Sequence, residues 1–236
     1  MLDLTTTKGR LVSAALRLAG ERPWSDVTLA DIAQAAGVSL VDLRRDFGSK
    51  GDILAALVRA VDDEVLAGAP QRTPEQPARD ALFEVVMRRF DVLAPYRPAL
   101  KSIAAAWPAD PMLLRALAAS QAWMLRAAGI GPEGLEGQLR TAGLGTIYAS
   151  VFRTWLEDDD PGLARTMAAL DRRLRRGERT LNTLDEIRSK LCDVASMFAS
   201  ARKRPSDEAP KPAPDAPPAP SAELEFEASS SPAATF

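Results

Sequence analysis

The segment from Val27 to Lys50 constrains the fold of this chain more than any other part of its sequence. Two short apolar-periodic stretches, residues 29–36 and 39–47, are joined by the turn residues Ala36-Gly37-Val38-Ser39. A glycine at this point can adopt the left-handed conformation that a tight turn between helices requires. The pattern therefore predicts a helix-turn-helix whose second helix is presented outward.

Polar and apolar spacing within the segment supports the same prediction. We expect Thr28 and Ser39 to cap the two helices, with Asp42 closing a capping box on Ser39. Leu43 and Phe47 are four residues apart, so they share one face of the second helix and form its buried side.

The rest of the first two hundred residues is also predicted to be helical. Glycine and proline fall between periodic segments, and no stretch alternates as a strand does. Helices are expected at about 6–20 and 50–67, followed by five or six longer ones. Three of these are expected to start where a capping residue precedes proline, at Thr73-Pro74, Asp110-Pro111 and Asp160-Pro161. The predicted fold class is all-α.

Composition excludes several classes of chemistry. The chain has no histidine, which removes the commonest general base, and its one cysteine, Cys192, cannot form an intramolecular disulfide. No nucleophile beside a base and no glycine-rich phosphate loop is found. The sequence shows neither a signal peptide nor an apolar run of membrane-spanning length. A cytoplasmic protein that is not an enzyme and needs no cofactor or metal is expected.

The helix-turn-helix segment resembles the TetR family of bacterial transcriptional regulators. The resemblance covers about the first 65 residues. Its matching positions are Thr28, Ile32-Ala33, Ala36-Gly37-Val38-Ser39, Leu43, Phe47, Ser49-Lys50 and Ile53-Leu54. It implies a three-helix DNA-binding head, residues 1–66, and a six-helix body for ligand binding and dimerisation, residues 73–201. It further implies a homodimer that binds a double-stranded DNA operator and releases it when a ligand binds.

Six residues of the head are predicted on this basis to contact DNA. They are Thr28, Ser39, Leu40, Arg44, Arg45 and Lys50. The chain departs from the family at neighbouring positions, where Val41 and Asp42 replace small residues, and Arg44 and Asp46 replace aromatics. Carboxylates repel phosphate. Residues 1–66 hold eight Lys or Arg against ten Asp or Glu, a poor balance for a DNA-binding domain.

A second resemblance concerns the C-terminal half of the chain. The run from Trp155 to Leu174, preceded by Trp123 and Tyr148, is similar to the ubiquinone-biosynthesis lipid-binding family, which shares the TetR fold without acting on DNA. It implies a pocket for a prenyl or acyl lipid and a terminal amphipathic helix that contacts a membrane. The alternative hypothesis is therefore a lipid-binding accessory protein with peripheral membrane contact.

The body offers candidate ligand-binding residues under either hypothesis. Ligand pockets are mostly apolar with few polar groups, so a small apolar or lipid-like effector is expected to contact aromatic and methionine side chains. The candidates are Trp107, Met112, Trp123, Met124, Tyr148 and Phe152. Core packing is the commoner role for any one of them.

The end of the sequence predicts two helices and a tail. Leu163, Met167, Leu170 and Leu174 recur at helical spacing beside Arg172, Arg173, Arg176 and Arg179, a cluster that favours anionic groups or a solvated face. A seam from Leu181 to Phe198 predicts a helix that packs on the body, pairs with a second subunit or lies on a membrane, and docking on the body is the first choice. Proline, alanine, serine and glutamate then dominate, which predicts a disordered tail over residues 202–236. A third hypothesis is a scaffold that recruits partners through this tail.

Overall fold

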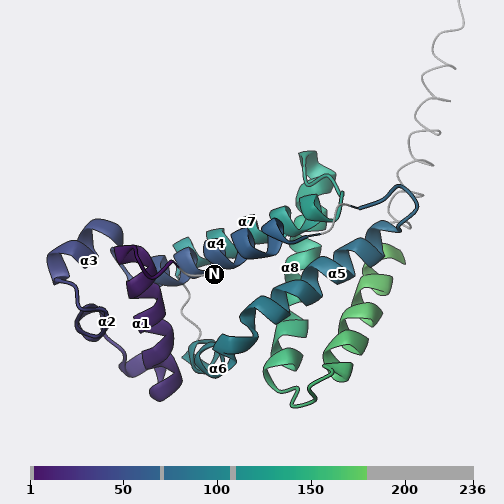
Figure 1. Cartoon of the computed structure of the whole chain (residues 1–236). Helices are drawn as coiled ribbons and strands as arrows, with labels where there is room; N and C mark the ends of the chain where they lie inside the picture. Colours follow the sequence, from purple (N-terminus) through teal and green to yellow (C-terminus); the bar gives the residue numbers. More distant parts are fainter. Residues whose placement is uncertain (1–2, 70–71, 107–109, 180–236) are drawn as a thin grey trace, which may run out of the picture. The chain divides into compact units, whose positions relative to one another are not determined.

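The computed structural model describes residues 3–69, 72–106 and 110–179, which lie within one compact unit of the chain. These residues are helical apart from their connections, and no strand occurs among them (Figure 1). The helices are α1 (Thr7–Glu21), α2 (Leu29–Ala36), α3 (Leu40–Asp46), α4 (Lys50–Ala67), α5 (Ala78–Leu93), α6 (Arg97–Ala106), α7 (Pro111–Ala127) and α8 (Gly134–Leu156), with 3₁₀ helices η1 (Trp24–Asp26) and η2 (Ala94–Tyr96). Residues 164–179 are also helical. The all-α prediction is confirmed, whereas Trp107, the seam from Leu181 and the tail lie outside the described residues.

Local capping signals explain why helices α1 to α4 begin and end close to their predicted boundaries. The Thr28 side chain accepts a hydrogen bond from the Asp31 amide, and the Asp31 carboxylate accepts one from the Thr28 amide. Ser49 and Asp52 make the same reciprocal pair at the start of α4. Gly37 ends α2 with a φ of 65°, the left-handed conformation that its turn requires. These contacts fix the helix-turn-helix from within the segment itself.

The dipeptides expected to start helices in the body have mixed outcomes. Asp110 caps the first amides of α7 and Pro111 is its first residue, as predicted. Helix α5 begins at Ala78 instead, and Thr73-Pro74 lies before it outside any helix. Asp160-Pro161 also precedes its helix, which starts at residue 164 with its amide bound to the Asp160 carboxylate. A polar residue before proline is common in turns as well as at helix starts, so the pattern alone does not separate them.

Helix α4 is shared by the head and the body. It packs against α1 on one side and against α5 and α7 on the other. One apolar core follows it, from Leu11 and Ile32 in the head to Phe90 and Trp155 in the body, all of them fully buried. A movement of α4 relative to the body therefore changes its packing against the head.

A buried polar cluster joins α4 to three helices of the body. The Asp62 carboxylate on α4 binds the Arg89 guanidinium on α5 and accepts a hydrogen bond from the Ser120 hydroxyl on α7 at 2.8 Å. Arg89 also donates to the Tyr148 hydroxyl on α8 at 3.1 Å. Burial raises the pKa of this hydroxyl, against the opposing effect of Arg89, so that Tyr148 is neutral at neutral pH. All four side chains are buried, so each depends on the others for its polar contacts.

Replacing Arg89 with methionine should lower the free energy of unfolding by about 3–5 kcal/mol, because the Asp62 charge stays buried without its cation. Urea denaturation measures this change. Arg59→Met on the exposed surface of α4 is the matched control and should change the value by less than about 0.5 kcal/mol. Adding Asp62→Leu to Arg89→Met should recover most of the loss, and a double variant no more stable than Arg89→Met would contradict this account.

Candidate nucleic-acid interface

Helix α3 exposes the face that the sequence predicts for DNA contact. Leu43 and Phe47 at its end are buried and anchor it on the head, as their spacing predicts. Leu40 and Val41 remain 56% and 62% exposed although both are apolar. The exposed side chains of the helix are Leu40, Val41, Arg44 and Arg45. Together they make a surface of two apolar and two cationic side chains, which we call the α3 face.

Acidic side chains beside the α3 face bind part of its positive charge. Arg45 donates to the Asp42 carboxylate at 2.9 Å, and the Ser39 hydroxyl donates to the same carboxylate at 2.7 Å. The predicted capping box is therefore only half formed, because Asp42 binds these groups instead of the Ser39 amide. Arg44 makes no ion pair with any residue that the structure describes. An exposed pair such as Asp42–Arg45 contributes about 1 kcal/mol or less, so Arg45 can exchange its carboxylate for a phosphate.

Thr28 and Ser39 stand at the N-termini of α2 and α3, where free amides attract anions. Each cap hydroxyl also donates to a carboxylate, from Thr28 to Asp31 at 2.7 Å and from Ser39 to Asp42. Hydrogen bonds from the Thr28 amide and hydroxyl lower the pKa of Asp31, which Arg22 also contacts at 2.7 Å. A phosphate that approaches either cap would meet a carboxylate there as well as the amides.

Lys50, the sixth residue predicted to contact DNA, is held by the head itself. Its ammonium donates to the Trp24 carbonyl at 2.8 Å and to the Val27 carbonyl at 2.7 Å, and it lies 4.7 Å from the centroid of the Trp24 ring. Partial burial lowers the pKa of the ammonium, while Asp26 opposes this shift. The side chain ties the first turn of α4 to η1 and the residue after it. We therefore expect Lys50 to stabilise the head in place of binding phosphate.

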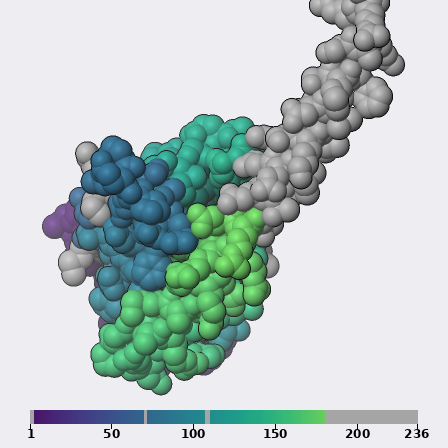
Figure 2. All heavy atoms as spheres, turned by 90° about the vertical axis from the view of Figure 1, so that its right-hand side faces the viewer, coloured from purple at the N-terminus to yellow at the C-terminus, as the bar shows by residue number. Residues whose placement is uncertain are grey.

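A cavity of about 960 Å³ lies in the body between the start of α5, the end of α7, α8 and residues 173–178. Figure 2 shows the face on which α5, in blue, and the helix of residues 164–179, in green, lie next to each other. The cavity is lined mainly by apolar side chains, among them Leu82, Leu125 and Ile147, with arginines from three helices. Small residues of α8, such as Ala142 and Gly143, leave room for it.

The ligand-binding candidates of the sequence lie elsewhere in the body. Met124 and Tyr148 are buried in the core, and Phe152 is half-buried, stacked on the Tyr148 ring and tilted against the Trp155 ring. Met112 and Trp123 are exposed on α7. None of these five lines the cavity. The large aromatic and methionine side chains chosen from the sequence either pack in the core or lie exposed on α7. The cavity is instead marked by small residues of α8 and by arginines.

Within residues 3–69, 72–106 and 110–179, no group of three or more His, Cys, Asp or Glu side chains is placed to hold a metal ion. Within the same ranges, none of the helices combines the length and the apolar character that crossing a bilayer demands.

The family model for bacterial regulatory proteins of the tetR family matches residues 11–57, from α1 to the first turns of α4. The N-terminal domain belongs to the TetR family. The chain is 39% identical over 90 residues to the HTH-type transcriptional regulator BetI of Rhizobium meliloti (strain 1021), which is 36% of this chain and 43% of that protein. It is 31% identical over 113 residues to the protein of the same name in Burkholderia ambifaria, 46% of this chain and 58% of that protein. The chain thus spans about half the length of these curated relatives.

Solved structures extend the likeness of fold into the body. The TetR transcriptional regulator from Nitrosomonas europaea has a TM-score of 0.56 and 24% identity, and the match covers 72% of this chain and 97% of that one. A TetR transcriptional regulator from Rhodococcus sp. RHA1 has a TM-score of 0.56 and 22% identity, with 70% and 92% covered. The TetR-like fold predicted from the sequence is therefore confirmed beyond the matched domain.

Lys50→Met should lower the free energy of unfolding by about 1–3 kcal/mol, because the Trp24 and Val27 carbonyls lose their donor. Thermal unfolding of the full chain measures the change as a lower Tm. Lys8→Met, at an exposed position of α1, is the matched control and should leave the Tm nearly unchanged. If Lys50→Met unfolds at the wild-type temperature, Lys50 returns to the set of predicted DNA contacts.

Proposed function

We propose that the protein is a TetR-family transcriptional regulator of the cytoplasm, acting as a repressor without enzymatic activity. The exposed α3 face on a TetR-family domain carries this proposal. Each relative and solved structure named above is a transcriptional regulator. These matches favour the regulator over the lipid-binding alternative.

Helix α3 is the element proposed to enter the major groove of the operator. Its exposed arginines suit guanine edges or phosphates, and Leu40 and Val41 suit the methyl group of thymine. Thr28 and Ser39 would support the helix at the phosphate backbone through the amides of their helix N-termini. Asp42 and Asp46 reduce the gain from phosphate neutralisation, so we expect moderate affinity with a strong dependence on sequence.

We propose that the regulator acts as a homodimer. A helix of seven residues contacts few base pairs. Helix-turn-helix proteins recognise a longer DNA site by presenting two such helices to successive major grooves. Large apolar side chains are exposed on the body, such as Trp123 on α7, Leu135 on α8 and Met167 on the following helix. Exposed apolar surface of this kind is typical of contact with another protein chain. Sedimentation equilibrium at micromolar concentration tests the assembly.

The proposed response to a ligand depends on α4. The cavity is lined by Leu144 and Ile147 of α8, and the next residue, Tyr148, contacts the Asp62–Arg89 pair. A ligand that shifts α8 therefore acts on a hydrogen-bonded group attached to α4. Because α4 continues to Lys50 beside α3, a change in its tilt alters how α3 is presented.

Arg44→Ala and Arg45→Ala should each weaken DNA binding, by roughly tenfold, while the fold survives. The probe is a duplex selected from a random library by the wild-type protein, with binding followed by fluorescence anisotropy between 50 and 200 mM salt. Loss of a phosphate contact should reduce the slope of log affinity against log salt concentration by about 1. Arg115→Ala on α7 is the matched control. Unchanged affinity in both α3 variants, or co-purified isoprenoid lipid without any DNA selection, would overturn the regulator proposal.

Asp46→Asn should have the opposite effect and strengthen binding to the same duplex. The substitution removes a negative charge from α3 and frees Lys8, whose ammonium lies 3.7 Å from the Asp46 carboxylate. Both changes favour phosphate. The difference should shrink as salt is raised, and weaker binding at low salt would show that Asp46 faces no phosphate.

A further inference from the structure

We propose that the body cavity binds an organic anion, with an apolar body against its floor and a carboxylate at its arginines. Arg173 and Arg79 are the residues that hold the carboxylate. This inference deepens the proposed function, since such a ligand would be the effector, but binding itself can be measured without DNA.

The floor of the cavity suits an apolar ligand of moderate size. Leu125, Leu144 and Leu174 line it from three helices. A Cβ atom added at Gly143 would meet no other atom within 4 Å, so this part of α8 borders open space. A volume of about 960 Å³ is at the upper end of the range for small-molecule sites. An alkyl or aromatic body can therefore be accommodated without displacing the core.

The charged side chains of the cavity favour an anion. Its lining holds four arginines, Arg79, Arg140, Arg173 and Arg176, against one acidic residue, Glu178. Arg140 binds Glu136 on its own helix. Arg173 makes no ion pair or hydrogen bond with the part of the chain that the structure describes. Positive charge in the lining thus exceeds the negative charge.

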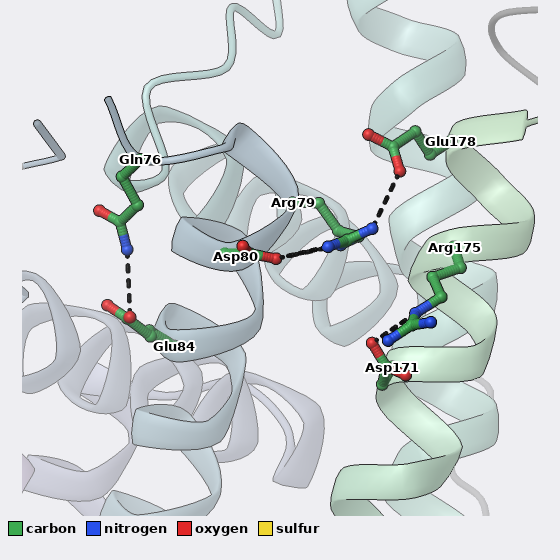
Figure 3. A network of polar contacts seen from close by, with 7 residues as sticks. All are labelled: Gln76, Arg79, Asp80, Glu84, Asp171, Arg175 and Glu178. Carbon is green, nitrogen blue, oxygen red and sulfur yellow. Dashed lines mark hydrogen bonds and ion pairs between the residues drawn. The ribbon is translucent and has the colours of Figure 1, made fainter. Parts of the chain in front are cut away.

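Arg79 is poised to exchange one of its partners for a ligand. Its guanidinium binds the neighbouring Asp80 at 2.9 Å and Glu178, on the helix of residues 164–179, at 3.4 Å (Figure 3). The Arg79 and Glu178 side chains are 31% and 49% exposed, and such a pair contributes about 1 kcal/mol or less. A ligand carboxylate can take the place of Glu178 with little loss and gain the fork of donors that a guanidinium offers.

Charge also argues against a second copy of the chain as the occupant. A second copy would bring its own arginines to the same place if the contact were two-fold, and like charges would meet. A small anion neutralises the surplus charge instead.

Isothermal titration of the full chain with dodecanoate tests the proposal, with dodecanol as a neutral probe of equal chain length. Dodecanoate should bind at least tenfold more tightly than dodecanol. Arg173→Gln should weaken dodecanoate binding at least threefold and leave dodecanol unchanged. Arg172→Gln, one residue away and outside the cavity lining, is the matched control and should bind as the wild type does. Equal affinity for the two probes, or an Arg173→Gln variant that binds dodecanoate like the wild type, would overturn the proposal.

A size variant separates the cavity from other surfaces. Ala142→Phe on α8 places a ring in the cavity lining and should abolish dodecanoate binding, whereas Ala118→Phe on the exposed surface of α7 should not. Circular dichroism and sedimentation confirm that both variants fold and assemble as the wild type does. If Ala142→Phe retains full dodecanoate affinity, the ligand binds elsewhere and the proposal is overturned.

Dodecanoate binding and DNA selection test the anion site and the regulator proposal separately. Dodecanoate that binds with the expected dependence on Arg173, in a protein that selects no DNA, supports the anion site and refutes the regulator. A protein that selects DNA but has no affinity for dodecanoate supports the regulator and refutes the anion site.

Discussion

The structure depends on the pairing of Asp62 with Arg89, because this contact attaches α4, a helix that packs on both the head and the body, to α5. Neither charge can be buried alone, so α4 keeps its place only while α5 supplies the cation. Ser120 and Tyr148 extend the requirement to α7 and α8. An apolar contact would tolerate sliding of α4, whereas a hydrogen-bonded charge fixes its register. This directional contact gives the body a defined hold on the head.

The parts of the fold that could be predicted from the sequence are those with local causes. The turn at Gly37 and the cap residues Thr28 and Ser49 act within four residues of the chain, so their effect is visible as spacing. Proline starts were less informative: Thr73-Pro74 lies outside a helix, because a polar residue before proline is also common in turns. The partners of Lys50, about 25 residues away, and of Asp62, on two other helices, leave no mark in the spacing. Such contacts depend on packing that only the folded chain defines.

The same distinction applies to the two candidate sites. The α3 face follows from helical periodicity, since burying Leu43 and Phe47 turns Arg44 and Arg45 outward. The cavity forms where side chains are too small to fill the space between helices. Large aromatic residues do not predict its position, because they fill such space. Tyr148 and Met124 were natural candidates by composition, but the core uses both. Small residues at Ala142 and Gly143, opposite an arginine-rich helix, are the better indicator of an unfilled volume.

At each of the two sites one arginine is held by a nearby acid that an incoming anion can replace, beside another arginine that makes no ion pair with the residues that the structure describes. Arg45 is paired with Asp42 on α3, and Arg79 is paired with Glu178 beside the cavity. These pairs are at least partly exposed to solvent, so they orient the guanidinium, yet an incoming anion loses little binding free energy when it breaks them. The acids lower non-specific attraction to polyanions, because they neutralise part of the positive charge. A ligand then gains only where its geometry lets it replace the carboxylate, so the acids of this head are consistent with selective DNA binding.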